Sequence, residues 1–191
     1  MKKHKKLLIT AAVLAAMVVA AIFLLRWVHI QTLYKMYPRD YAEEVTAAAK
    51  ENGLDPNLVY AVIRQESRFQ ADAESSAGAV GLMQLTPETF QWLQKQEHGS
   101  VTLPTSSLRN PAVNVKYGCR FLAYLIKKSG VLHTSLCAYN AGSGRVDSWL
   151  KDSSLSKDGK TLLSVPYPET EDYARKVEQN YEQYKELYGS D

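Results

Sequence analysis

Residues Leu7 to Leu25 form an apolar run of 19 residues in which Thr10 is the only polar side chain. An α-helix rises about 1.5 Å per residue, so a helix of this length spans roughly the 30 Å hydrocarbon core of a bilayer. Arg26 and Trp27 follow the run, as is typical of residues at a membrane interface. So uniform a run disfavours a buried helix of a soluble domain. The sequence therefore predicts an N-terminal transmembrane helix.

A cleaved secretory signal is the alternative interpretation of this segment. Ala20-Ala21 is small enough for a cleavage site, but residues 22–25 continue the apolar run beyond it. We therefore favour an uncleaved anchor. The chain then divides into a basic cytoplasmic segment at 1–6, a transmembrane signal-anchor at 7–25, a membrane-proximal connector at 26–39 and a catalytic or binding domain at 40–191.

The positive charge of the chain is concentrated around this apolar run. Residues 1–26 hold five of the 23 Lys and Arg residues and contain no Asp or Glu. The rest of the chain carries 18 basic side chains against 20 acidic ones, which disfavours a nucleic-acid partner. Lysines that precede a spanning segment stay in the cytoplasm, so we expect a single-pass membrane protein whose domain lies on the extracytoplasmic side.

The remainder of the chain predicts helices and no strands. Asp55-Pro56, Thr86-Pro87 and Asn110-Pro111 each place a capping side chain before proline at the first helical position. The third of these begins a helix in which apolar residues recur at three-to-four spacing. Further helices are expected over about 40–50, 132–141 and 144–150 and after Pro168. Residues 98–109 are polar and irregular, and the fold class is all-α.

One carboxylate, Glu66, falls on the apolar face of the helix expected at 56–67. Val59 and Val62 mark the buried stripe of this helix, and Glu66 lies seven residues after Val59. Removal of a carboxyl group from water raises its pKa, so the group can donate a proton near neutrality. Pairing with a neighbouring arginine, or exposure at a fraying helix end, is the alternative interpretation.

No second catalytic constellation competes with Glu66 in the sequence. The four histidines are scattered, and the chain has neither a nucleophile elbow nor a phosphate-binding glycine loop. Two cysteines are too few for a four-thiolate zinc site. Cys119 and Cys137 lie at unequal distances from the turn at Ser129-Gly130, which favours buried free thiols over a disulfide. We therefore expect no metal and no cofactor.

A series of short motifs begins at Glu66 and continues in a fixed order. In chain order the motifs are Glu66-Ser67-Arg68-Phe69; Ser75, Gly78 and Gly81-Leu82-Met83-Gln84-Leu85 with Pro87; Asn110-Pro111 with Asn114 and Gly118; Ala138-Tyr139-Asn140-Ala141-Gly142; and Pro166-Tyr167-Pro168-Glu169-Thr170 with Tyr173. Together they resemble the motifs of the soluble lytic transglycosylases, lysozyme-like enzymes that cut peptidoglycan. The resemblance covers about residues 40 to 187 and implies a lysozyme-like helical domain.

This resemblance implies cleavage of the β-1,4 bond between N-acetylmuramic acid and N-acetylglucosamine without water. Glu66 would act first as acid and then as base, and the products would carry 1,6-anhydromuramoyl ends. The partners would be peptidoglycan glycan strands, the membrane and envelope or cell-wall machinery. By the same resemblance the substrate-binding residues would be Ser75, Met83, Gln84, Tyr139, Asn140 and Tyr173.

Two rival functions remain open at this point. A muramidase would hydrolyse the same bond, and its product would be one water heavier than an anhydro end. An anchored glycan-binding protein would have lost catalysis, which the retention of Glu66 disfavours. The sequence also departs from the family pattern at Thr86, where Met is usual, and at Phe121, where Tyr is frequent. We expect the glycan contacts near these two positions to differ.

The lysines before the apolar run lead to a topology prediction. We expect protease added outside intact spheroplasts to digest residues 40–191, because Lys2, Lys3, Lys5 and Lys6 keep the N-terminus in the cytoplasm. Immunoblotting against both ends of the chain measures this. Protection of the domain in intact spheroplasts, with digestion only after lysis, would show that the topology is reversed.

Overall fold

The computed structural model describes residues 2–189 of the chain, without the side chains of residues 2–4, 7, 8, 11 and 12. Met1 of the predicted cytoplasmic segment and Ser190 and Asp191 of the predicted domain therefore lie outside the described residues. The side chains of Lys2 and Lys3, on which the topology prediction depends, lie outside them as well. The chain forms two units, residues 1–38 and residues 39–191.

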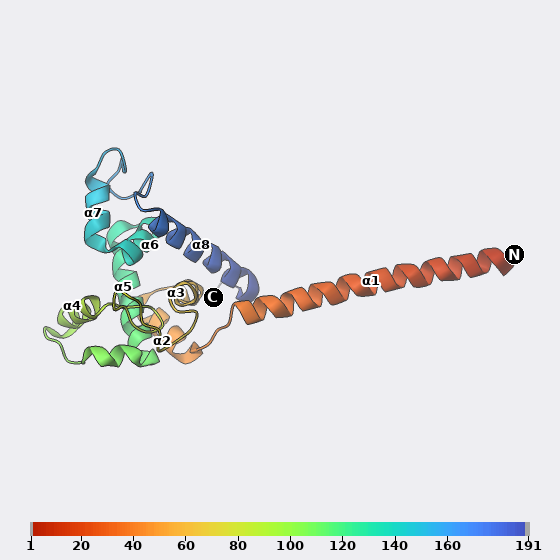
Figure 1. Ribbon diagram of the computed structural model, residues 1–191, viewed down its shortest axis with the longest axis horizontal. Helices are drawn as coiled ribbons and strands as arrows, with labels where there is room; N and C mark the ends of the chain where they lie inside the picture. Colours follow the sequence, from red (N-terminus) through yellow and green to blue (C-terminus); the bar gives the residue numbers. More distant parts are fainter. Residues whose placement is uncertain (1, 190–191) are drawn as a thin grey trace. The chain divides into compact units, whose positions relative to one another are not determined.

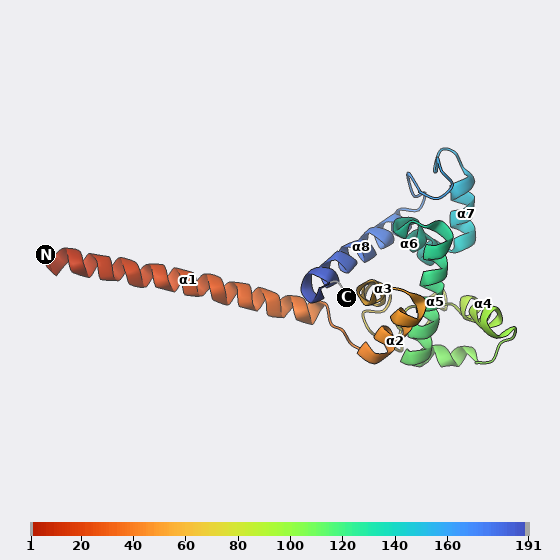
Figure 2. The same cartoon turned by 180° about the vertical axis from the view of Figure 1, so that it is seen from behind.

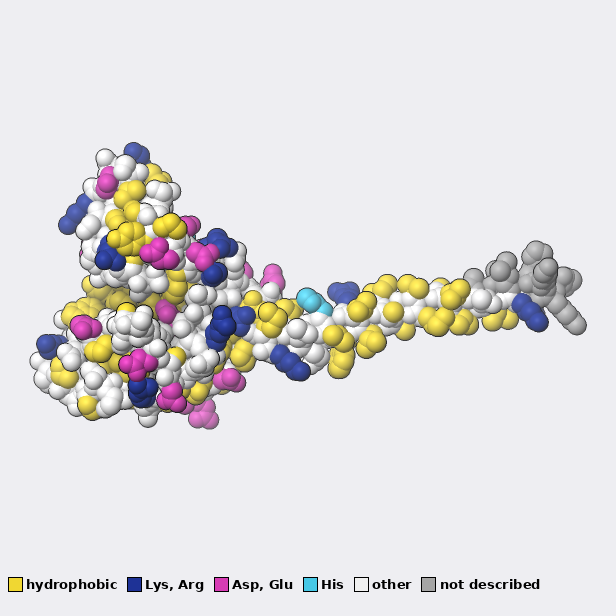
Figure 3. Space-filling model, in the orientation of Figure 1, with side chains coloured by type: hydrophobic (Ala, Val, Ile, Leu, Met, Phe, Trp, Pro, Cys, Tyr) yellow, Lys and Arg dark blue, Asp and Glu magenta, His cyan; other side chains and the backbone are white. Residues whose placement is uncertain are grey.

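The first unit is one helix, α1 (Lys2–Met36), which continues well beyond the end of the apolar run. The connector expected at 26–39 is thus helical as far as Met36. Residues Val13–Met36 are long and apolar enough to cross a membrane, with a mean hydropathy of 2.2 over the most apolar part. Figure 3 shows hydrophobic side chains along this helix, and Phe23 and Leu25 are 68% and 69% exposed. An exposed apolar surface of this extent indicates a membrane or another apolar partner.

The second unit is built from helices, and its described residues contain no strand (Figure 1). This confirms the predicted all-α class. The helices are α2 (Ala42–Asn52), α3 (Pro56–Glu66), α4 (Pro87–His98), the 3-10 helix η1 (Thr105–Arg109), α5 (Pro111–Ser129), α6 (Leu132–Ala141), α7 (Ser143–Lys151) and α8 (Pro168–Tyr188). The stretch at 98–109 therefore contains a short helix, η1, that the sequence analysis did not predict.

Three helix starts have the capping geometry expected from the sequence. Asp55, Thr86 and Asn110 each accept a hydrogen bond from a backbone N–H of the following turn, at 2.8, 3.2 and 2.9 Å. Each is followed by proline at the first helical position. Thr86, which departs from the family pattern, therefore has a structural role as the cap of α4. Such a cap contributes about 1 kcal/mol to the stability of the helix.

Helix α5 lies at the centre of this unit, packed against α2 and α6, while α8 packs along α3 and α6 (Figures 1 and 2). The core contains the fully buried side chains of Ile63, Leu122, Leu136 and Val177. A second apolar cluster joins α4 to η1 and the start of α5 around Phe90. Because α3, α6 and α8 pack together, side chains from these three helices are able to meet in one site.

An ionic contact joins the start of α6 to α8. The His133 ring lies between two carboxylates of α8, with Nδ1 3.1 Å from Glu178 Oε2 and Nε2 3.1 Å from Glu171 Oε2. Hydrogen bonding to Cys137, and then to the two glutamates, raises the pKa of His133 to about 10, although burial opposes this shift. The imidazole is therefore a cation at neutral pH.

This contact predicts a pH-dependent stability difference between the wild type and His133→Gln. An unfolded histidine titrates near pH 6.5, so the cation stabilises the fold fully below that pH. This stabilisation by the His133 cation declines as the pH rises from about 6.5 through 10. After allowance for solvent screening, we expect the free energy of unfolding of the wild type to exceed that of the variant by about 1–2 kcal/mol at pH 6. Urea unfolding at pH 6, 8 and 10 measures this, and a difference that does not decrease with pH would contradict the assignment.

Candidate active site

Glu66 is the last residue of α3 and is half-buried, one turn after the buried Val62 and Ile63 of the predicted apolar stripe. Its carboxylate Oε1 accepts a hydrogen bond of 2.6 Å from Tyr173 Oη of α8. The side chain keeps partial solvent access, and the protein around it raises the pKa of Glu66 to about 7 by desolvation, which the Tyr173 hydrogen bond partly offsets. Protonated and ionised forms therefore coexist near neutral pH, as a group that donates and then accepts a proton requires.

Two tyrosines enclose Glu66. Tyr173 is 6% exposed, and Tyr139 of α6 is 9% exposed. The Tyr139 hydroxyl donates a 2.8 Å hydrogen bond to the backbone oxygen of Met83. Burial raises the pKa of both phenols well above 10, and the neighbouring charge of Glu66 raises it further. Both phenols are therefore neutral, and their hydroxyl groups act as hydrogen-bond donors.

The loop from Ser67 to Thr86 carries several of the predicted site residues and has an unusual backbone. Arg68, Phe69 and Gln84 have φ values of 51°, 66° and 48°, which non-glycine residues seldom adopt. Strain of this kind persists only where the surrounding structure fixes the chain. The hydroxyl of Ser67 contributes to this, since it donates to the Leu82 oxygen at 2.8 Å.

The main restraint on this loop is the fully buried side chain of Asn114 on α5. Its Oδ1 accepts from the Met83 N–H at 2.7 Å, and its Nδ2 donates to the oxygens of Val80 and Leu108 at 2.8 and 2.9 Å. Gly81 has a φ of 83°, and a Cβ there would lie 2.2 Å from Asn114 Nδ2. Only glycine fits at this position, and the motif that contains Asn114 did not predict this role.

Two of the predicted contact residues keep unused hydrogen-bonding capacity. Ser75 Oγ accepts from the Ala79 N–H at 3.1 Å, which leaves its hydroxyl proton to be donated. The Gln84 side-chain N–H group donates to the oxygens of Ala73 and Gly81, at 3.1 and 2.9 Å. Its amide oxygen has no partner among the described residues and is able to accept one.

Met83 lies beneath the loop and has no exposed surface. Its side chain fits against Gly118, where an added Cβ would lie 2.3 Å from the Met83 sulfur. Met83 therefore packs beneath the loop, and in this structure its side chain presents no surface to a ligand. Met83 contributes to the site through its backbone oxygen, which accepts the hydrogen bond that orients Tyr139.

Asn140 is exposed at the end of α6, and the structure ties it to α8. Its Oδ1 accepts a 2.9 Å hydrogen bond from the buried hydroxyl of Thr170, which leaves the amide N–H group to face a ligand. Sequence reasoning missed Thr170, although its place beside Glu169 in the last motif was a signal.

In residues 2–189, leaving aside the undescribed side chains, no group of three His, Cys, Asp or Glu residues is arranged to hold a metal ion. Cys119 and Cys137 are buried and free.

The helical fold, the strained loop and the desolvated glutamate together define a lysozyme-like helical class of protein. Residues 43–162 match the family model described as the transglycosylase SLT domain, and the chain belongs to that family.

Named relatives agree with this family assignment. The chain is similar to the soluble lytic murein transglycosylase of Escherichia coli strain K12, with 29% identity over 153 residues, 79% of this chain and 23% of that protein. It is 32% identical over 124 residues to the membrane-bound lytic murein transglycosylase F of Pseudomonas fluorescens, which covers 61% of this chain and 23% of the relative. The chain thus spans about a quarter of the length of these curated relatives.

A solved structure has the same fold. Lytic transglycosylase Slt of Pseudomonas aeruginosa, solved as an inactive glutamate-to-glutamine mutant, has a TM-score of 0.68 and 30% identity. The match covers 81% of this chain and 25% of the other.

The Asn114 contacts predict a large loss of stability for Asn114→Ala. The variant leaves one N–H group and two carbonyl oxygens buried without partners, so we expect a loss of about 3–5 kcal/mol in the free energy of unfolding. Asn52→Ala is the matched control, because Asn52 makes a single hydrogen bond to its own helix at 2.8 Å and should cost under about 1 kcal/mol. Urea unfolding followed by circular dichroism measures both, and equal losses would refute the special role of Asn114.

Proposed function

We propose that this chain is a membrane-anchored lytic transglycosylase of peptidoglycan. It cleaves the β-1,4 bond between N-acetylmuramic acid and N-acetylglucosamine and leaves a 1,6-anhydromuramoyl end. The observation that carries the proposal is the Glu66 carboxyl group, which is desolvated, bonded to Tyr173 at 2.6 Å and has a pKa raised to about 7. A relative that was solved as an inactive glutamate-to-glutamine mutant supports an essential glutamate in the family.

In the first step the protonated form of Glu66 donates its proton to the glycosidic oxygen, and the bond to the muramoyl C1 breaks. An oxocarbenium-like centre develops at C1, and the acetamido oxygen of the substrate stabilises it. The Glu66 carboxylate that remains accepts the Tyr173 hydrogen bond, which favours the ionised form. Tyr173 therefore helps the acid to release its proton.

In the second step the same carboxylate removes the proton of the muramoyl C6 hydroxyl. The C6 oxygen then closes onto C1, which completes the anhydro ring and returns Glu66 to its protonated form. A pKa near 7 suits both steps, because neither form of the carboxyl group is strongly favoured at neutral pH.

The surrounding side chains hold the sugar in place for these steps. Ser75 donates its free hydroxyl proton, and Gln84 accepts through its amide oxygen. Asn140 presents its amide N–H group from the opposite wall, where Thr170 fixes its orientation. Met83 and Tyr139 act together, since the Met83 backbone oxygen orients the Tyr139 ring beside the reacting sugar.

A hydrolytic muramidase is less well supported, because hydrolysis commonly uses a second carboxylate. No other carboxyl group among the described residues perturbs the pKa of Glu66. Glu74 forms an ion pair with Arg109 at the surface, and Glu88 is exposed in the first turn of α4. Both acids thus have roles that do not involve Glu66.

Attachment to a membrane completes the proposal. Helix α1 includes a segment of spanning length and hydropathy, and membrane-bound relatives are known in the family. With its N-terminus in the cytoplasm, such an anchor holds residues 40–191 on the extracytoplasmic side, where peptidoglycan lies. Envelope or cell-wall machinery is the expected partner there.

The decisive variant is Glu66→Gln, which keeps the shape of the side chain but neither donates nor accepts the proton. General acid–base assistance contributes about 10²–10⁴-fold, and one residue supplies both halves here, so we expect a loss at or beyond the upper end. The assay is release of anhydromuropeptides from purified sacculi, with products identified by mass.

Glu74→Gln and Glu88→Gln are the matched controls, and both should keep most of the activity. Circular dichroism establishes that each variant is folded. Substantial release by Glu66→Gln would refute the assignment of the acid. Products one water heavier than the anhydro form would show that the wild type is a muramidase.

A further inference from the structure

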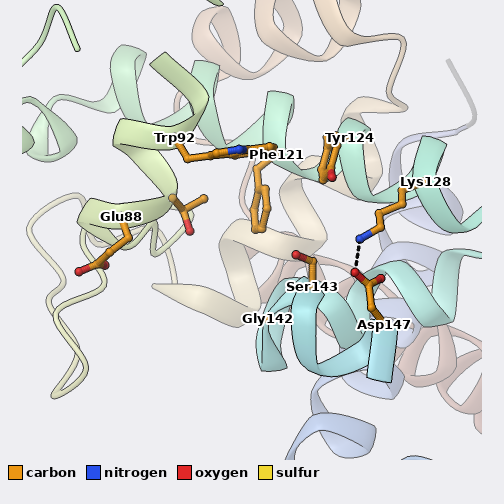
Figure 4. A pocket seen from close by; sticks show the side chains of 9 residues that line it. Glu88, Trp92, Phe121, Tyr124, Lys128, Gly142, Ser143 and Asp147 are labelled. Atoms are coloured by element: carbon orange, nitrogen blue, oxygen red, sulfur yellow. Dashed lines mark hydrogen bonds and ion pairs between the residues drawn. The ribbon is translucent and has the colours of Figure 1, made fainter. Parts of the chain in front are cut away.

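A groove of about 560 Å³ opens between α4, α5 and α7 (Figure 4), and Glu66 is not among the residues that line it. Glu66 lies at the end of α3 and its partner Tyr173 lies on α8, and neither helix contributes a side chain to this groove. The geometry of the acid therefore depends on how α3 and α8 are held against each other. The two helices pack along one another, and a cluster of contacts joins them at the end away from Glu66.

The start of α3 is bonded to the end of α8. Tyr181 Oη donates a 2.8 Å hydrogen bond to Asp55 Oδ2, which belongs to the side chain that caps α3. Asn57 is fully buried, and its Nδ2 donates to the backbone oxygen of Gly189, the residue after α8, at 2.9 Å. Because both bonds cross between the helices, they fix where the end of α8 lies along α3.

Arg39 contacts both helices at this end, although it lies on neither of them. Its Nη2 donates a 2.5 Å hydrogen bond to Asn57 Oδ1. Its guanidinium carbon lies 4.1 Å from the ring centre of Tyr188 on α8 and 5.4 Å from that of Tyr60 on α3. A guanidinium group within about 6 Å of a ring centre is attracted to the ring, and its planar shape allows stacking. Arg39 therefore ties α3 and α8 together.

Both helices are regular enough to transmit a shift from Arg39 to the acid. After their first residue, neither α3 nor α8 contains Gly or Pro, the residues that most often kink a helix. Glu66 follows Asn57 by nine residues, which is about 14 Å of helix, and Tyr173 precedes Tyr188 by 15 residues, which is about 22 Å. A displacement of α8 along α3 at the Arg39 end therefore changes the 2.6 Å hydrogen bond between Tyr173 and Glu66.

We propose that Arg39 is a positioning residue for the hydrogen bond between Tyr173 and Glu66. It holds α3 and α8 in the register at which the Tyr173 hydroxyl reaches the carboxylate. Arg39 directly follows residues 1–38, the unit that contains α1, so the segment that leads out of the proposed anchor also fixes the two helices of the acid. The inference rests on the proposed function, because it assigns Arg39 to the same reaction.

The test measures two properties of the detergent-solubilised full chain: the titration midpoint of the Glu66 carboxyl group by carbon NMR, and the rate of anhydromuropeptide release over a range of sacculus concentrations. Arg39→Ala should raise the midpoint in the same direction as Tyr173→Phe, because the hydrogen bond that favours ionisation is weakened. We expect kcat to fall about threefold to tenfold, less than the roughly 10²-fold cost of a 1 Å misplacement. KM should stay unchanged, since Asn114 holds the glycan-binding loop independently of Arg39.

A double variant separates positioning from stability. If Arg39 acts through Tyr173, Arg39→Ala should leave both the midpoint and kcat of a Tyr173→Phe chain unchanged, because the hydrogen bond is already absent. Arg175→Ala is the matched control, since Arg175 is an exposed arginine of α8 whose ion pair with Asp172 stays within that helix. It should equal the wild type in both measurements.

Circular dichroism establishes that each variant is folded. Arg39→Lys keeps the charge without the planar group, so it gives the same test with a smaller perturbation. A loss of stability in Arg39→Ala with an unchanged midpoint and kcat would overturn the proposal. So would an equal effect of Arg39→Ala in the wild type and in Tyr173→Phe, or an equal loss with Arg175→Ala. The midpoint does not depend on cleavage, so a wild type that releases no anhydromuropeptides would contradict the proposed function alone.

Discussion

Three hydrogen bonds from the buried Asn114 side chain hold the loop that shapes the candidate active site. They fix the backbone on either side of Gly81, at Val80 and Met83, and place the Met83 backbone oxygen where the Tyr139 hydroxyl binds it. The same arrangement positions Gln84, whose side chain bonds back to the loop. The geometry around Glu66 therefore depends on a residue of α5 that itself lies outside the cleft.

Two opposing effects determine the pKa of Glu66. Desolvation at the end of α3 raises the pKa of the carboxyl group, and the hydrogen bond from Tyr173 lowers it. The resulting pKa, about 7, lies between the pKa of an exposed glutamate and the pKa of a fully desolvated one. Burial of this kind destabilises the fold above the unfolded pKa, because the ionised form is poorly solvated in the native state. A residue selected for stability alone would not be an acid.

Local signals in the sequence were sufficient for most of the helices and for the position of Glu66 in its helix. Capping side chains followed by proline predicted the starts of α3, α4 and α5, and periodicity placed Glu66 in line with the apolar stripe of α3. The 3-10 helix η1 was missed because so short an element has no apolar period. The helical extension of α1 from Arg26 to Met36 was missed because hydropathy marks the membrane-spanning length and carries no information on where a helix ends.

Contacts between residues that are distant in the sequence could not be predicted from local patterns. Thr170 bonds to Asn140 across 30 positions, and Tyr173 bonds to Glu66 across 107, so each depends on how α8 packs against α6 and α3. Motif resemblance indicated that Tyr173 is a substrate-binding residue, but no local rule predicted its hydrogen bond to Glu66. The full burial of Met83 against Gly118 likewise follows from tertiary packing, which composition and spacing do not encode.

The proposed mechanism depends on a Glu66 carboxyl group whose pKa lies near neutrality. Carbon NMR of the side-chain carboxyl groups, with the Glu66→Gln spectrum used to assign the resonance, measures this pKa directly. We expect a midpoint at about pH 7 and a higher midpoint in Tyr173→Phe, which loses the hydrogen bond that favours ionisation. A midpoint near 4.5, the value of an ordinary glutamate, would contradict it.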